Sequence, residues 1–158
     1  MDNYLLVIHI LAGEIGAFSF LWNFIEMLNP TDTRLSRART SAMIGLVSIV
    51  ISWISGGIYY LTKYGSSIKP IIKAGPLPWA HLVIMEVKEH VFLFLPFLAF
   101  MAYASLKDQN VCPIEKSDCH KSHLRFSGLV FLLGLSMVAM GFMITFGYRE
   151  AVEGMIAK

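Results

Sequence analysis

Ionisable side chains interrupt two long apolar stretches of the chain. The first stretch, residues 4–28, contains three of them, and the second, residues 79–106, contains five. They are His9, Glu14 and Glu26 in the first stretch, and His81, Glu86, Lys88, Glu89 and His90 in the second. A charged side chain in the hydrocarbon of a bilayer costs about 2.5–3.5 kcal/mol even on lenient insertion scales. These side chains therefore need partners or a cofactor.

Two imidazoles on different helices are what the iron of a b-type haem requires. Neutral histidine binds iron axially, and the porphyrin is buried among apolar and aromatic side chains. At a rise of about 1.5 Å per residue, His9 lies roughly 8 Å below the start of the first stretch and His90 roughly 16 Å below the start of the second. We expect His9 and His90 to hold haem b, with His81 as the alternative partner of His9.

The acidic residues could bind a cofactor or a metal, or carry protons. On a helix of 100° per residue, Glu86 and His90 point within about 40° of each other. Carboxylates there could serve a haem propionate, a quinone or a proton path. A different interpretation is a metal-binding or proton-coupled transporter. Its non-haem transition metal (iron, manganese or zinc) would be held by His9, His90, Glu14, Glu86 and Glu89.

Four apolar stretches set the expected architecture. Residues 42–62 and 126–148 contain no charged residue, and each is long enough to cross a bilayer. With residues 4–28 and 79–106 they predict an all-α, integral membrane four-helix bundle, a single transmembrane domain. Only 15% of the residues are charged and 56% are hydrophobic, whereas a soluble domain has about 25% charged residues. The composition argues against a soluble enzyme or a secreted disulfide scaffold, and the surplus apolar surface is expected to face the lipid bilayer.

The basic residues predict an orientation in the cell (inner) membrane. Seven lie in the predicted loops 29–41 and 107–125, against five in the predicted loop 63–78 and near the C-terminus. The positive-inside bias therefore places both termini of this multi-pass chain outside. The net charge of +2, without a long basic run, argues against nucleic-acid binding.

The polar residues near the cytoplasmic side are expected to be less informative. Cys112 and Cys119 form a C-x6-C-H pattern, which differs from the C-x-x-C-H of covalent haem attachment. In the predicted orientation they are reduced thiols, whereas the inverted topology would let them pair. His120 and His123 are expected to be solvated at a helix start, and Asn23 and Glu26 to be interfacial.

Short motifs along most of the chain resemble the CopD-like superfamily of small membrane proteins, which includes the four-helix protoporphyrinogen oxidase of the HemJ type. The matching segments are Ile8-His9-Ile10-Leu11-Ala12 followed by Gly13 and Gly16, Ser55-Gly56-Gly57-Ile58-Tyr59-Tyr60, and Trp79-Ala80-His81 with Lys88. The resemblance implies that His9 is associated with haem and that Lys88 is functional. Glu86, Glu89 and His90 stand where that family has apolar residues, which favours a haem-binding redox protein over a porphyrinogen oxidase.

The sequence thus predicts a membrane b-type cytochrome. It would pass electrons between a membrane quinone and a redox partner protein, and an oxidoreductase activity is compatible with this role. The alternatives are the Glu/His transporter and a small subunit of a larger respiratory complex, and association into a homo-oligomer stays open. Gly56 and Gly57 are expected to permit close approach of a helix or a cofactor.

Overall fold

A computed structural model describes residues 4–107 and 117–157, and this part of the chain contains helices and no strands. The helices are α1 (Tyr4–Leu28), α2 (Asp32–Tyr59), the π-helix η1 (Tyr60–Ile68), α3 (Lys69–Ala74), the π-helix η2 (Ala80–Met85), α4 (Glu86–Lys107) and α5 (Ser117–Ile156). The all-α prediction is confirmed.

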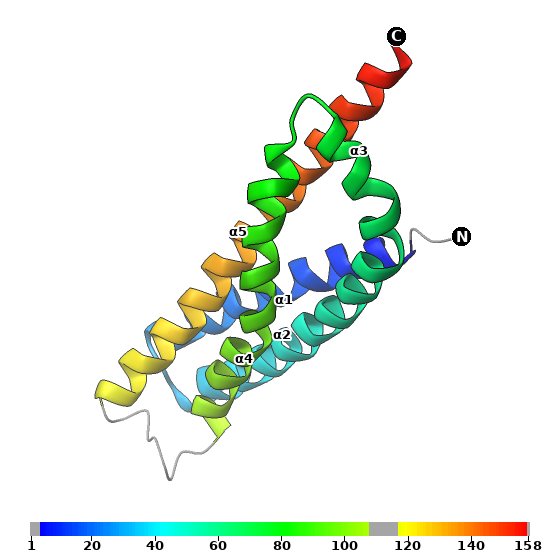
Figure 1. Cartoon of the computed structure of the whole chain (residues 1–158). Coiled ribbons are helices and arrows are strands. Elements are labelled where there is room, and N and C mark those ends of the chain that lie inside the picture. Colours follow the sequence, from blue (N-terminus) through cyan, green and yellow to red (C-terminus); the bar gives the residue numbers. More distant parts are fainter. Residues whose placement is uncertain (1–3, 108–116, 158) are drawn as a thin grey trace.

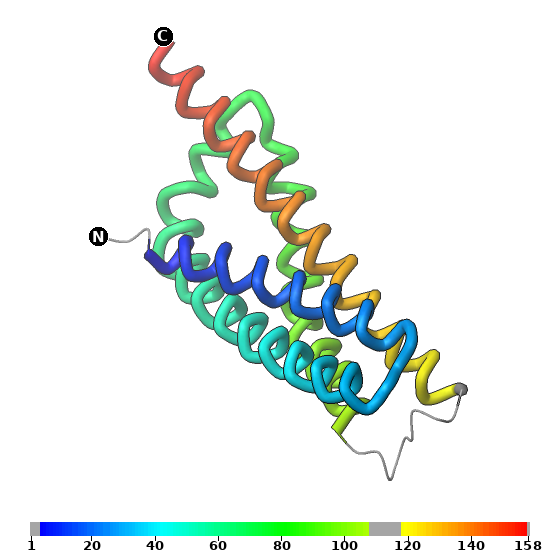
Figure 2. The backbone as a smooth tube through the Cα atoms, turned by 180° about the vertical axis from the view of Figure 1, so that it is seen from behind, coloured from blue at the N-terminus to red at the C-terminus, as the bar shows by residue number. Residues whose placement is uncertain are grey.

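The long helices α1, α2, α4 and α5 run alternately in opposite directions. α1 lies along α2 over most of its length and also packs on α5, while α4 packs on both α2 and α5 (Figures 1 and 2). η1 and α3 arch from the end of α2 to the far part of α5 (Figure 1). The chain then returns through η2 and α4.

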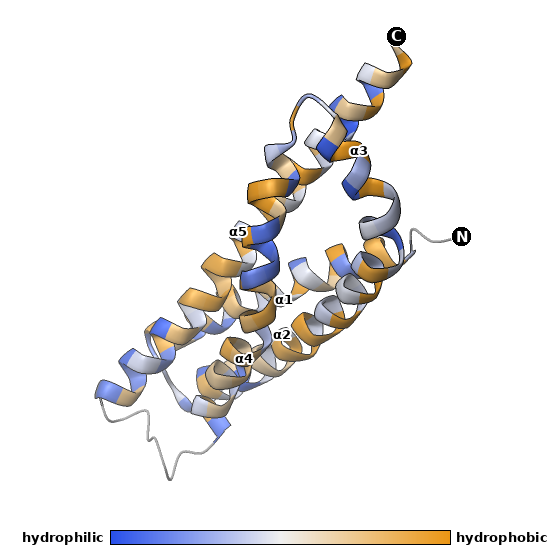
Figure 3. Ribbon diagram, in the orientation of Figure 1, coloured by the Kyte–Doolittle hydropathy of each residue, from blue (hydrophilic) through white to orange (hydrophobic). Residues whose placement is uncertain are grey.

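Three helices of the described chain are long and apolar enough to cross a membrane. They are Tyr4–Leu28, the continuous helical segment Asp32–Ala74, and Asp118–Ile156. Large apolar side chains cover the outside of the bundle, and Phe94, Phe97 and Phe142 are each more than 60% exposed. Apolar residues dominate the long helices, while a hydrophilic turn interrupts α4 near its start (Figure 3). This is the surface expected of a membrane protein. α4 lies where the fourth span was predicted but is not among these three helices.

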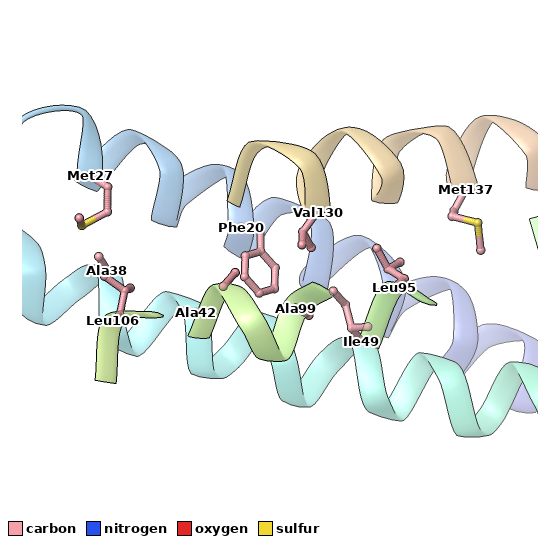
Figure 4. Packing of buried hydrophobic residues seen from close by; sticks show 11 residues of the cluster. Phe20, Met27, Ala38, Ala42, Ile49, Leu95, Ala99, Leu106, Val130 and Met137 are labelled. Carbon is pink, nitrogen blue, oxygen red and sulfur yellow. The ribbon is translucent and has the colours of Figure 1, made fainter. Parts of the chain in front are cut away.

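The main core forms where small residues let the helices approach closely. Phe20 of α1 is completely buried, and a Cβ atom on Gly45 of α2 would lie only 2.8 Å from its ring. Ala42 of α2 and Ala99 of α4 are also completely buried (Figure 4). Van der Waals packing through small residues is the usual means of helix association in lipid. The core fixes α1, α2 and α4 relative to one another.

Several predicted boundaries were wrong outside the first helix. α2 begins at Asp32, where the Thr31 hydroxyl accepts a hydrogen bond from the Arg34 amide at 3.3 Å, so most of the predicted loop 29–41 is helical. The predicted loop 63–78 contains most of η1 and all of α3, and α5 begins at Ser117 rather than near residue 126. An apolar run predicts only the part of a helix that can lie in the hydrocarbon of a bilayer. The ends of the helix are set by capping residues, which can lie well outside that run.

Candidate functional site

His9 is held against α2 by hydrogen bonds to one serine, whose Oγ also lies 3.0 Å from His9 Nδ1. The Ser52 hydroxyl donates to the His9 carbonyl oxygen at 2.8 Å, and His9 Nδ1 lies 2.9 Å from the Ser52 carbonyl oxygen. A carbonyl oxygen only accepts, so Nδ1 carries the proton and Nε2 keeps its lone pair. This is the tautomer in which an imidazole binds a metal through Nε2, its ring oriented by a backbone carbonyl.

Gly56 makes room for the His9 ring. A Cβ atom at this position would lie 2.5 Å from His9 Nδ1 and 2.8 Å from Cε1, whereas a Cβ on Gly57 would meet nothing within 4 Å. The predicted close approach is therefore made by Gly56, with the imidazole as the approaching group.

Aromatic rings connect His9 to α4. The rings of His9 and Phe92 meet edge to face with centroids 5.9 Å apart, and Phe92 stacks on Trp53 of α2 at 6.3 Å. Phe92 thus brings α4 to the imidazole that α1 and α2 hold.

Lys88 lies one helical turn before Phe92 on α4, within electrostatic range of His9. The lysine is half-buried, and a Cβ atom on Gly141 of α5 would lie 3.3 Å from its Nζ. Among the residues that the structure describes, no carboxylate forms an ion pair with Lys88. We call His9, Lys88 and Phe92 with Ser52 and Gly56 the His9 site.

The two histidines predicted as partners of His9 lie elsewhere. His90 is exposed, and its Nδ1 lies 2.6 Å from the Glu86 carbonyl oxygen of its own helix. His81 of η2 is 1% exposed, and its Nδ1 lies 3.1 Å from the hydroxyl of Tyr64 in η1. The described contacts therefore do not pair His9 with a second imidazole.

The predicted carboxylates are dispersed. Glu86 is exposed, Glu89 is half-buried within range of the Tyr60 hydroxyl, and Glu14 lines a shallow groove of about 380 Å³ on α1 with Leu11 and Trp22. No group of three or more His, Cys, Asp or Glu side chains that could hold a metal occurs within residues 4–107 and 117–157. The alternative metal ligands His9, His90, Glu14, Glu86 and Glu89 therefore do not come together as a group of three or more in this part of the chain.

A second buried polar cluster, which the sequence pattern did not predict, lies at the other end of the bundle. His123 is 1% exposed and Asn23 is completely buried, so the prediction of a solvated His123 and an interfacial Asn23 was wrong. His123 Nε2 lies 2.8 Å from Asn23 Oδ1, and His123 Nδ1 lies 2.8 Å from Ser105 Oγ. Ser127 donates to Asn23 Oδ1 at 2.6 Å. We call Asn23, Ser105, His123 and Ser127 the His123 cluster.

A sequence signal for this cluster existed. His123 and Ser127 are spaced by one helical turn, and Asn23 stands in an otherwise apolar part of its helix. A buried amide in an apolar helix requires hydrogen-bond partners. Only the packing of α1, α4 and α5 reveals which partners these are.

Glu26 also has a structural role that was not expected. Its carboxylate accepts hydrogen bonds from Arg34 Nε at 2.9 Å, from Arg37 Nε at 2.8 Å and from Trp22 Nε1 at 3.1 Å. These contacts tie the end of α1 to the start of α2. His120 is half-buried, with Nε2 2.6 Å from the Met27 carbonyl oxygen.

Cys119 is disulfide-bonded, which differs from the expected thiol, while Cys112 lies outside the described residues.

No family model, curated protein or solved structure matches the chain.

Proposed function

We propose that this chain is a membrane-embedded b-type haem protein that takes part in electron transfer, with His9 as an axial ligand. The observation that carries the proposal is the hydrogen bond from His9 Nδ1 to the Ser52 carbonyl oxygen at 2.9 Å. It orients an imidazole within an apolar helix and leaves Nε2 as the basic nitrogen, which is the form that binds iron.

Lys88 gives the proposal its second support. A half-buried ammonium group in an apolar bundle is costly without a negative partner. None of the described ion pairs includes Lys88, and the side chain lies on the side of α4 that reaches α5 at Gly141. The propionates of a haem would supply the missing negative charge, so we assign Lys88 to propionate binding.

His90 remains the proposed second ligand, at a structural cost. Its Nδ1 is hydrogen-bonded to the Glu86 carbonyl oxygen at 2.6 Å, which leaves Nε2 as the basic nitrogen. His90 is two residues from Phe92, so it projects from the other side of α4, and its ring must rotate toward His9 to reach the same haem. Since the His90 side chain is exposed, no packed core opposes this rotation. His9 fits the role of a ligand as it stands, and His90 fits it only after this change.

Haem, when bound, supplies one-electron iron chemistry. The chain supplies orientation through Ser52, Gly56 and Phe92, and compensating charge through Lys88. We propose a membrane quinone and a redox protein as partners. The exposed carboxylate of Glu86 and the half-buried carboxylate of Glu89 are the groups on α4 that could exchange protons with the medium.

The test is the visible absorption spectrum of the protein purified after expression with an adequate haem supply. A Soret band and sharp reduced-minus-oxidised bands are expected, and His9→Ala should abolish them. His120→Ala is the matched control, because that imidazole binds the Met27 carbonyl oxygen and should leave the spectrum intact. Purified protein without a Soret band, or an unchanged spectrum in His9→Ala, would refute the proposal.

The His90→Ala variant separates two coordination states. Loss of the low-spin signature with haem retained would identify His90 as the second ligand. An unchanged low-spin spectrum would remove His90 from the proposal and leave His9 as the assigned ligand.

A further inference from the structure

The His123 cluster lies away from the His9 site and is not used in the proposed function. It joins all four long helices, because the Asn23 side chain of α1 also donates from Nδ2 to the Ala38 carbonyl oxygen of α2 at 2.7 Å. Ser105 belongs to α4, and His123 and Ser127 belong to α5. The chemistry of each group fixes which atoms donate and which accept in this cluster.

One side of the His123 ring has a fixed proton. Asn23 Nδ2 faces a carbonyl oxygen, so the amide is oriented with Oδ1 toward the imidazole. An amide oxygen only accepts, and therefore His123 Nε2 must be the donor across the 2.8 Å contact. The Ser127 hydroxyl donates to the same oxygen at 2.6 Å. This half of the cluster is satisfied whatever the charge of the ring.

The other side of the ring has two satisfied arrangements. Ser105 Oγ lies 2.8 Å from His123 Nδ1 and also 2.8 Å from the Ala102 carbonyl oxygen. A hydroxyl has one proton, so Ser105 can donate to only one of them. When Ser105 donates to Nδ1, the ring is neutral. When Ser105 donates to the Ala102 carbonyl oxygen, Nδ1 can carry a proton and donate to Ser105 Oγ, and the ring is a cation.

We propose that His123 is a reversible proton-binding site inside the helical bundle. Rotation of the Ser105 hydroxyl accommodates the incoming proton at Nδ1, so that neutral and cationic rings are both fully hydrogen-bonded without movement of a helix. Unpaired buried polar groups are costly, and this arrangement avoids them in both charge states.

The charged and titratable groups around His123 leave the ring without a direct ionic partner. On α5 the nearest is His120, one turn away. On α1 Glu26 is bound to Arg34 and Arg37, on α2 Arg39 donates to the Leu106 carbonyl oxygen, and on α4 Lys107 is exposed. Among the described residues no carboxylate contacts the ring. Hydroxyl, amide and carbonyl groups alone would stabilise the added charge.

The test is a pH titration of the full chain in lipid nanodiscs, with 15N-labelled histidine followed by NMR and the His123 signals identified by their loss in His123→Gln. As the pH falls from about 8 to about 3 we expect Nδ1 to gain a proton while Nε2 stays protonated. Absence of titration in this range, or titration at Nε2, would overturn the proposal.

A pair of serine variants tests the role of the hydroxyl. Ser105→Ala removes the group that accepts from Nδ1–H in the cation, so the midpoint pH should fall by about one unit or more. Ser127→Ala should move it less, because Ser127 meets the half of the cluster that does not change. Equal shifts in the two variants would contradict the assignment of Nδ1. Should either variant fail to fold, the wild-type titration still decides the proposal.

Discussion

The imidazole of His9 occupies space that only a glycine at position 56 leaves open. A Cβ atom on Gly56 would lie 2.5 Å from His9 Nδ1, while the neighbouring Gly57 has open space at the same position. The two glycines are adjacent in one helix, so they differ in this contact far more than in helix propensity. They form a matched pair of sites for substitution.

Gly56→Ala should displace the His9 ring from the Ser52 carbonyl oxygen. Overpacking of this kind typically costs about 1–3 kcal/mol. We expect a lower thermal unfolding midpoint in detergent and weaker haem binding. Gly57→Ala should change neither property appreciably. Equal effects of the two substitutions would show that the close contact at Gly56 has no functional consequence.

Lys88→Gln should weaken haem binding without removing the iron ligand. A charge-assisted hydrogen bond to a propionate is worth about 1.5–3 kcal/mol, which corresponds to about a 10- to 100-fold loss of affinity. Haem titration of the apoprotein measures it. The control is Lys73→Gln, since Lys73 is exposed in α3. The same affinity in wild type and Lys88→Gln would exclude a propionate contact.

The hydrogen bond between Tyr64 and His81 should stabilise the two π-helices. Tyr64 is 4% exposed, and removal of its hydroxyl leaves His81 Nδ1 buried without this partner. Tyr64→Phe should lower the free energy of unfolding by about 1–3 kcal/mol, measured by denaturation in mixed micelles. Tyr4→Phe, at an exposed tyrosine, should have little effect. A similar free energy of unfolding for both variants would show that the hydrogen bond between Tyr64 and His81 does not stabilise the protein.

Asn23→Leu should destabilise the bundle more than an ordinary polar substitution. Loss of the amide removes the acceptor of His123 Nε2 and of the Ser127 hydroxyl, while the Ala38 carbonyl oxygen keeps the Ser41 hydroxyl as a donor at 3.0 Å. Each unsatisfied buried group costs about 1–3 kcal/mol. Ser136→Ala provides the comparison, because that hydroxyl bonds only the Leu133 carbonyl oxygen of its own helix. A smaller decrease in the free energy of unfolding for Asn23→Leu than for Ser136→Ala would contradict a stabilising role of the His123 cluster.

Periodicity and apolar length were enough to predict α1 and the helical class, because both depend on composition along one segment. The same information misplaced His90, whose angle and depth on its helix do not reveal that Nδ1 bonds the Glu86 carbonyl oxygen. It also missed the burial of His123, which depends on three helices packing together. Side-chain rotamers and helix–helix contacts are long-range properties, and spacing within one segment does not determine them.

The arrangement of the helices predicts four crossings of the membrane, with α4 as the fourth. In that topology residues 73 and 121 lie on opposite sides of the membrane, and the basic residues place position 121 in the cytoplasm. Single cysteines at these exposed positions, in a chain whose native cysteines are replaced by serine, can be labelled with a membrane-impermeant thiol reagent in intact cells. We expect labelling at position 73 and protection at position 121. Labelling of both would exclude a crossing by α4.

A companion measurement on the chain with its native cysteines bears on Cys119, which is disulfide-bonded in the structure and lies two residues before position 121. Disulfides rarely persist in the cytoplasm, so the charge bias and the disulfide favour opposite orientations. The side on which position 121 lies and the redox state of Cys119 should therefore change together. Labelling at position 121 with protection at position 73 predicts an oxidised Cys119 and inverts the topology. A disulfide combined with a cytoplasmic position 121 would contradict this dependence.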